Sequence, residues 1–266
     1  MKNALNTREI RSYKINDRKV PLKMLTCYDF QTAQLLNETN LDMILVGDSL
    51  GNVILGYENT IKVTLEEMII FSSAVKRGAP NKFVIGDMPF GAYSTLEDGI
   101  RNATNLFQKG SIEAVKLEGA FPYQLELITR LVQTGIPVMG HIGLTPQSVH
   151  QLGGYYTHGK NNQSKEMLLT SARNLQEAGV FALVLECVEA SLAAKITEEL
   201  SIPTIGIGSG KNTDGQVLVI NDLLKMGKDK PPKFVSPVAD LYNLKKELIE
   251  KYLESLNLDN ENNLYH

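Results

Sequence analysis

The stretch MILVGDSLG, residues 43–51, runs from an unbroken apolar segment through a glycine into an aspartate, Asp48. Unbroken apolar runs are typical of parallel strands covered on both faces, whereas half-exposed strands alternate apolar and polar residues. Comparable runs recur along the whole chain. We predict strands at residues 23–27, 43–47, 82–86, 113–117, 137–141, 182–186, 203–207 and 216–220.

Amphipathic segments lie between these runs and have the end signals of helices. TLEEMIIFSSAVKRG, residues 64–78, begins with Thr64 and Glu67 at the spacing of a capping box and ends at a glycine. Two later segments end in the same way, at Gly110 and Gly179. The chain therefore alternates strands and helices along most of its length.

This alternation predicts an α/β fold, a closed (β/α)8 TIM barrel with eight parallel strands. Right-handed crossovers in one unbroken series favour closure over an open doubly wound sheet. A Rossmann fold would need glycines after the first strand, and YDFQTAQ, residues 28–34, has none. Without a linker, residues 1–266 are expected to form a single catalytic barrel domain, with a frayed polar tail at residues 256–266.

Composition excludes several classes of protein. The net charge is -3, from 27 basic and 30 acidic residues, and the chain has no runs of like charge. It therefore lacks the excess of basic residues typical of proteins that bind nucleic acid or anionic lipid. We find neither a signal peptide nor a membrane-length apolar segment, and therefore expect a cytoplasmic protein. Cys27 and Cys187, far apart within apolar runs, suit buried residues in a reducing compartment.

Polar side chains recur at the carboxyl ends of the predicted strands. They are Asp48, Asp87, Glu118, His141 and Glu186, and Asp29 after the first strand is a further candidate. In a barrel these ends converge on one rim, where active sites of this fold are built. Taken singly, each position also fits a turn or a helix cap, which recruit the same residue types.

Three acids on consecutive strands call for a further explanation. At an effective dielectric of about 20, carboxylates ~4 Å apart repel by roughly 4 kcal/mol, so a cluster must protonate, spread apart or hold a cation. Lys116 should point to the same face as Glu118 but supplies one positive charge. Oxygen ligands without thiolates or paired histidines point to Mg²⁺ or another hard ion rather than zinc, held directly or through water by Asp48, Asp87 and Glu118.

A metal at this rim would suit chemistry on a 2-oxo acid. It can bind the carboxylate and keto oxygens and stabilise the enolate that forms when a neighbouring proton leaves. We expect Glu186 to be the base, because it lies across the rim and its apolar approach, ALVLE, should raise its pKa. The alternative for Glu186 is a cap or a salt bridge.

Seven motifs resemble the ketopantoate hydroxymethyltransferase family. They are LVGDSLG (45–51), AVKRGAP (74–80), GDMPFGAY (86–93), VKLEG (115–119), GHIGLTPQSV (140–149), LVLECV (183–188) and GIGSGKNTDGQ (206–216), and they span about two thirds of the chain. The ten-residue string GHIGLTPQSV is the most specific of them. At Ser209 the family more usually has alanine, and the usual basic residue after KFV (233–235) is absent.

The resemblance implies a TIM barrel of the phosphoenolpyruvate/pyruvate superfamily and a metal-stabilised enolate. The expected reaction transfers a hydroxymethyl group from 5,10-methylenetetrahydrofolate to 3-methyl-2-oxobutanoate, giving 2-dehydropantoate for pantothenate and coenzyme A synthesis. Mg²⁺ is the implied cofactor, and a homodecamer is the implied assembly. By resemblance, Asp48, Asp87 and Glu118 match the metal-site acids, Ser49 and Lys116 bind substrate with Asp48, Asp87 and His141, and Glu186 is the proton acceptor.

Two alternatives stay open at the level of sequence. Another metal-dependent 2-oxo acid aldolase or lyase of this superfamily would use the same metal and enolate without folate, although a KKCGH-type loop is absent here. A barrel that binds a metal and a small acid without catalysis is the second. Lys116, Glu118 and Glu186 together argue against that loss of activity.

Overall fold

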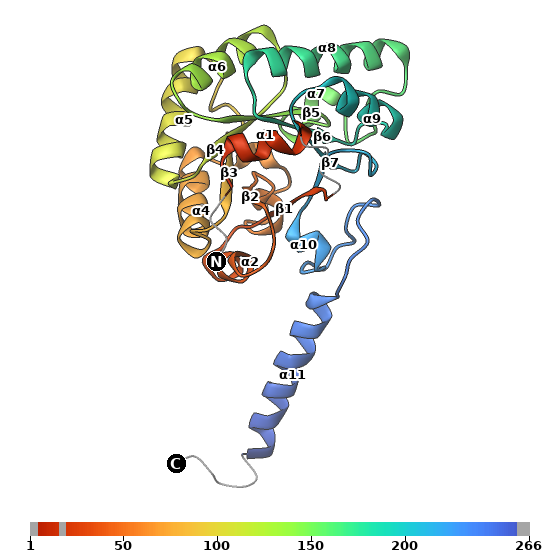
Figure 1. The fold of residues 1–266 in the computed structure, drawn as a ribbon. Helices are drawn as coiled ribbons and strands as arrows, with labels where there is room; N and C mark the ends of the chain where they lie inside the picture. Colours follow the sequence, from red (N-terminus) through yellow and green to blue (C-terminus); the bar gives the residue numbers. More distant parts are fainter. Residues whose placement is uncertain (1–4, 16–19, 260–266) are drawn as a thin grey trace. The chain divides into compact units, whose positions relative to one another are not determined.

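The eight apolar runs form one closed parallel barrel in the computed structural model, which describes residues 5–15 and 20–259 (Figure 1). The strands are β1 (Leu22–Thr26), β2 (Met43–Val46), β3 (Phe83–Asp87), β4 (Ala114–Glu118), β5 (Val138–Gly143), β6 (Ala182–Glu186), β7 (Thr204–Ile207) and β8 (Gly215–Leu218). Each strand pairs with the next, and β8 pairs with β1. The predicted TIM barrel is confirmed, with strand ends within one or two residues of the expected positions.

Helices follow most of the strands and end where the local signals placed them. The helices of the barrel are α1 (Thr7–Ile15), α2 (Phe30–Asn37), α3 (Leu50–Val53), α4 (Leu65–Gly78), α5 (Leu96–Gly110), α6 (Pro122–Gln133), α7 (Val149–Leu152), α8 (Asn162–Ala178) and α9 (Ala190–Glu199), with short 3-10 turns η1 (Thr60–Lys62) and η2 (Pro146–Ser148). The capping box of α4 is confirmed, with Thr64 and Glu67 exchanging hydrogen bonds. Gly179 ends α8 with φ +100, a conformation in which glycine is favoured.

The barrel interior is a packed apolar core. Inward-facing residues such as Met43, Phe83 and Ile85 are fully or almost fully buried in one cluster. Ile10 of α1, a helix that the sequence patterns did not predict, packs into the same cluster with Leu22, the first residue of β1. α1 thus packs near the start of β1, whereas the polar residues of the predicted site lie at the opposite, carboxyl-terminal rim.

The chain divides into two compact units, residues 1–218 and 219–266. All eight strands of the barrel lie within the first unit. The expectation that residues 1–266 form one domain stays a prediction. The second unit contains α10 (Ile220–Leu223) and α11 (Leu241–Asp259). The expected tail at 256–266 overlaps the end of α11, and its part beyond residue 259 lies outside the described residues.

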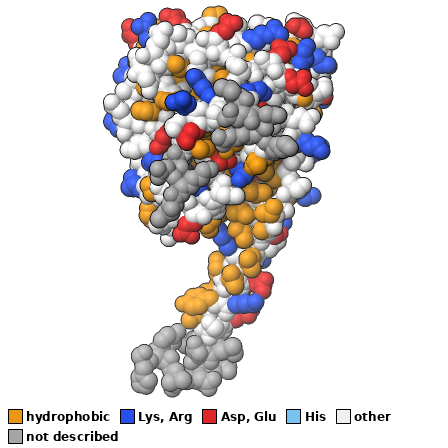
Figure 2. Space-filling view, viewed as in Figure 1, with side chains coloured by type: hydrophobic (Ala, Val, Ile, Leu, Met, Phe, Trp, Pro, Cys, Tyr) orange, Lys and Arg blue, Asp and Glu red, His pale blue; other side chains and the backbone are white. Residues whose placement is uncertain are grey.

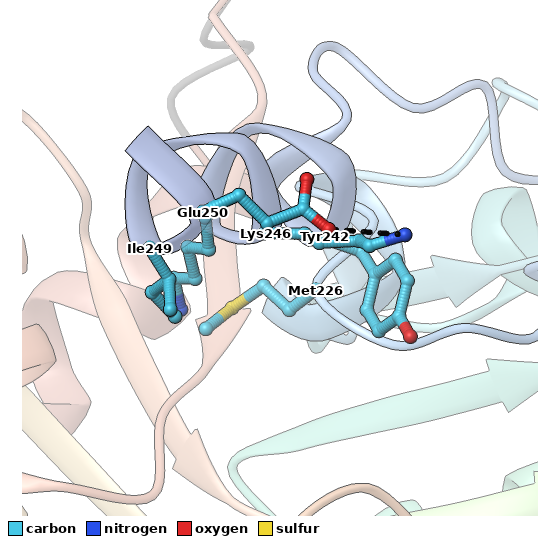
Figure 3. A pocket seen from close by; sticks show the side chains of 6 residues that line it. Met226, Tyr242, Lys246, Ile249 and Glu250 are labelled. Carbon is cyan, nitrogen blue, oxygen red and sulfur yellow. Dashed lines mark ion pairs between the residues drawn. The ribbon is translucent and has the colours of Figure 1, made fainter. Parts of the chain in front are cut away.

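Within the second unit, α11 exposes several apolar side chains, among them Leu248 and Tyr252. Figure 2 shows apolar side chains on the surface of this helix. A pocket of about 450 Å³ lies beside it, lined by Met226 and Tyr242 and flanked by an ion pair of 3.6 Å between Lys246 and Glu250 (Figure 3). Within the described ranges, no helix combines the length and apolar character that crossing a membrane requires.

Candidate active site

The three predicted acids lie together at the carboxyl ends of β2, β3 and β4. Asp87 and Glu118 are the last residues of their strands, and Asp48 follows β2 after one glycine. All three are almost completely buried, with exposed fractions of 4% for Asp48, 2% for Asp87 and 4% for Glu118. The Asp48 backbone N–H donates to Asp87 Oδ2 at 3.1 Å, which links two of the three sites directly.

Lys116 neutralises part of this charge from inside the barrel. Its Nζ lies 2.9 Å from Asp87 Oδ1, and its own exposed fraction is 4%. Burial, the largest influence, lowers the pKa of Lys116, but the charges of Asp87, Glu118 and Asp48 outweigh it and raise that pKa above its ordinary value. Lys116 therefore stays a cation. Its position two residues before Glu118 places both side chains on the same face, as the period-two rule predicted.

His141, from β5, bridges the acids of β4 and β6. Its Nδ1 lies 3.4 Å from Glu118 Oε1 and its Nε2 lies 3.2 Å from Glu186 Oε2. Burial and the Lys116 charge lower the pKa of His141, but the contacts with Glu118 and Glu186 raise it overall to about 9. Near neutral pH the ring thus carries a second proton between two carboxylates. The neutral form would instead accept at Nδ1 from Lys116 Nζ, 3.2 Å away.

Gln147, which sequence reasoning did not single out, is the polar hub of the site. Its Nε2 donates to Asp48 Oδ2 at 2.8 Å and to the Met88 carbonyl at 2.9 Å, while its backbone N–H donates to Glu118 Oε2 at 3.2 Å. The Tyr93 hydroxyl donates to Gln147 Oε1 at 2.8 Å. Gln147 stands in η2, inside the GHIGLTPQSV motif. That motif was the available signal, but no spacing rule marks this residue within it.

The remaining protonation states follow from burial and like charge. Burial and then the neighbouring charges of Asp87 and Glu118 raise the pKa of Asp48 well above its ordinary value, although Lys116 and Gln147 oppose the shift. Burial also raises the pKa of Asp87 despite its ion pair with Lys116. The cluster therefore has more negative charge than its surroundings stabilise, which is the condition under which a carboxylate group binds a proton or a cation.

Two other predicted residues differ in their placement. Ser49 follows Asp48 and its Oγ lies 2.8 Å from the hydroxyl of Tyr28, a buried side chain on the loop after β1. Asp29 is exposed, and its side chain accepts from the Thr32 N–H at 2.8 Å as the N-cap of α2. The suggestion that Asp29 joins the acid cluster is therefore wrong, because its carboxylate caps a helix.

The family model described as ketopantoate hydroxymethyltransferase matches residues 5–260. The chain belongs to the ketopantoate hydroxymethyltransferase family. A protein named 3-methyl-2-oxobutanoate hydroxymethyltransferase from Leptospira interrogans is 49% identical over 88% of this chain and 89% of its own length. The equivalently named protein from Carboxydothermus hydrogenoformans is 51% identical over 88% of this chain and 85% of its own.

Solved structures with a similar fold are far more distant in sequence than these family members. A 2,3-dimethylmalate lyase, described as a PEP mutase/isocitrate lyase superfamily member, superimposes with a TM-score of 0.62 at 14% identity, covering 97% of this chain and 90% of its own. A phosphoenolpyruvate phosphomutase from Streptomyces platensis also reaches 0.62, at 11% identity, over 96% of this chain and 88% of its own. At these identities the likeness concerns the barrel fold alone.

Proposed function

We propose that this member of the ketopantoate hydroxymethyltransferase family transfers a hydroxymethyl group from 5,10-methylenetetrahydrofolate to 3-methyl-2-oxobutanoate. The product is 2-dehydropantoate, a precursor of pantothenate and coenzyme A. The observation that carries the proposal is identity of about half to the named relatives over almost the whole chain. The buried site at the barrel rim contains the acids, the lysine and the histidine that this chemistry needs.

Mg²⁺ is the proposed cofactor, and the donor set fits it in a limited way. Across the described part of the chain, no group of three or more His, Cys, Asp or Glu side chains is arranged so that it could hold a metal ion. Mg²⁺, however, is commonly held by one or two carboxylates, with substrate oxygens and water completing its shell. Asp48 and Asp87 offer such a pair, with Glu118 available through water. Burial, together with the charges of Asp87 and Glu118, raises the pKa of Asp48, and a bound cation would oppose that shift. When bound, the ion would polarise the keto group of the substrate.

The residues of the chain supply binding and proton transfer. An ammonium group has three donors, and Lys116 directs one of them toward Asp87. The protonated His141 ring cannot accept another at Nδ1, so Lys116 has donors available for a substrate carboxylate. Ser49, whose hydroxyl is held by Tyr28, is the proposed second contact for that carboxylate. His141 lies between Glu118 of β4 and Glu186 of β6 and is the last of the proposed substrate-binding residues.

Glu186 is the proposed base that removes the proton from C3 of the oxo acid. Its side chain is 18% exposed, whereas that of Glu118 is 4% exposed, so Glu186 is the more accessible to a bound substrate. The contact between His141 Nε2 and Glu186 Oε2 at 3.2 Å orients the carboxylate of the base.

Replacing Glu186 by glutamine tests this role. Glu186→Gln is expected to abolish exchange of the C3 proton of 3-methyl-2-oxobutanoate with solvent, measured by NMR in deuterated buffer, while substrate still binds. Glu189→Gln is the matched control, because Glu189 is a half-buried carboxylate that caps α9 by accepting from the Leu192 N–H. Exchange at the wild-type rate in Glu186→Gln would remove this residue from the role of base.

The overall function is tested by following consumption of methylenetetrahydrofolate with and without the oxo acid, and with Mg²⁺ or a chelator. We expect consumption only when both the oxo acid and the metal are present. Turnover of a 2-oxo acid without folate would instead identify a lyase or aldolase of the same fold.

Assembly and location belong to the same proposal. A homodecamer in the cytoplasm is the state that the family resemblance implies, and sedimentation velocity of the purified chain tests the assembly. A monomer at micromolar concentration would contradict it.

A further inference from the structure

The turn that follows β6 contains a residue in an uncommon backbone conformation directly after the proposed base. Glu186 is the last residue of β6, and the next residue, Cys187, has φ +49. A residue other than glycine is less stable in this left-handed conformation by about 1 kcal/mol or more, and it adopts the conformation only where the surrounding structure enforces it. The direction in which Glu186 leaves the strand therefore depends on contacts around this turn.

One buried hydroxyl makes two of these contacts. Ser209 Oγ accepts from the Val188 N–H at 2.9 Å and donates to the Leu185 carbonyl at 2.8 Å. Leu185 precedes Glu186, and Val188 follows Cys187, so a single side chain joins the backbone on both sides of the turn. Ser209 is 1% exposed, which keeps water from replacing it readily.

The other contacts at the turn involve only backbone atoms. Glu186 O accepts from the Leu144 N–H at 2.8 Å, and the Cys187 N–H donates to Ile207 O at 2.9 Å. Neither needs a side chain at position 209, although the Ile207 carbonyl also lies 3.3 Å from Ser209 Oγ. An alanine at this position would leave the Val188 N–H without its acceptor.

We infer that Ser209 is a positioning residue for Glu186, holding the β6–α9 turn so that the base meets the substrate in a fixed orientation. The inference rests on the proposed role of Glu186. It goes beyond that role because the Ser209 hydroxyl bonds to backbone groups of Leu185 and Val188 and acts through the backbone of the turn.

Ser209→Ala tests the inference in the full-length enzyme, because it removes the hydroxyl and keeps the Cβ. Ser72→Ala is the matched control, since Ser72 is also completely buried but its hydroxyl has no hydrogen-bond partner within the described residues. The measurements are the C3 exchange rate per folded enzyme, kcat, KM for the oxo acid, and the unfolding midpoint in urea.

Loss of one buried hydrogen-bonded bridge should slow exchange and kcat by about three- to tenfold in Ser209→Ala. KM for the oxo acid should stay unchanged, and Ser72→Ala should match the wild type. An unchanged exchange rate in Ser209→Ala, with or without a lower unfolding midpoint, would overturn the inference and leave a structural role only. Failure of the base assignment itself is recognised separately, because Glu186→Gln would then still exchange the C3 proton.

Discussion

Replacing Gln147 by glutamate places a new carboxylate against the buried acids and tests how strongly they repel. The two side chains have nearly the same shape, so the substitution exchanges an amide donor for an acidic oxygen. Gln147 Nε2 lies 2.8 Å from Asp48 Oδ2, and Gln147 is 6% exposed. The new group would therefore face Asp48 at hydrogen-bonding distance with little solvent to screen it.

The size of the effect follows from two costs. At an effective dielectric of about 20, unit charges at the 2.8 Å separation of these atoms repel by about 6 kcal/mol. Keeping one extra proton on the pair costs about 1.4 kcal/mol for each pH unit above about 4.3, the pKa of an exposed glutamate. At about pH 7.5 this amounts to about 4 kcal/mol, less than the repulsion. The folded variant should therefore bind the extra proton until roughly pH 8.5.

The assay is urea unfolding of wild type and Gln147→Glu between about pH 4.5 and 8. The new carboxyl group has a pKa that is higher in the folded state than in the unfolded state. Its stabilising protonation is therefore fully present below the unfolded pKa and is lost as pH rises. The deficit in the free energy of unfolding should thus be small near pH 4.5 and grow by about 1.4 kcal/mol per pH unit.

Gln176→Glu is the control, because Gln176 lies at the surface and its Oε1 accepts from the Ser201 N–H. It should show no comparable growth with pH. A deficit for Gln147→Glu that stays constant across the range would refute the reasoning, since it would show that the acids at the rim do not repel across this contact.

Three further outcomes are expected. Lys116→Met should lower the free energy of unfolding by about 3–5 kcal/mol at neutral pH, because it leaves a buried carboxylate unpaired. The loss should be smaller in acid, where that carboxylate can bind a proton. Equal losses at both pH values, measured by urea unfolding, would contradict this. Gly143→Ala should destabilise the protein and slow C3 exchange, since a Cβ there would clash with the Glu186 carbonyl oxygen. Gly135 also has a positive φ, but a Cβ there would meet nothing within 4 Å, so Gly135→Ala should leave exchange unchanged. Burial raises the pKa of Cys27 from 9.0 to about 12. Cys27 should therefore react with iodoacetamide about a thousandfold more slowly in the native protein than in urea, as measured by peptide mass spectrometry. Equal rates would place its thiol in solvent.

The strands and several helix ends could be predicted because their signals are local. An unbroken run such as residues 43–46 is apolar whatever its partners are, and Thr64 caps α4 through a residue three positions away. The convergence of Asp48, Asp87 and Glu118 also followed, because strand order and closure place the ends of parallel strands at one rim. Asp29 shows the limit of this reasoning, since a strand-end acid and a helix cap look alike in sequence.

The contacts that orient the site could not be read from spacing. Gln147 reaches Asp48 across 99 positions of sequence, and Ser209 reaches Val188 across 21. Both stand on segments after strands, where the path of the backbone depends on the neighbouring loops. The same holds for His141, whose raised pKa arises from carboxylates on two other strands.

By itself, the sequence determined the barrel, the identity of the acids at its rim and the family, because apolar periodicity, capping and motif strings are properties of short segments. Only the tertiary structure decided which groups share protons and which hydroxyl or amide holds each carboxylate. Those properties depend on distances of about 3 Å between atoms from different strands, and packing around a closed barrel sets these distances.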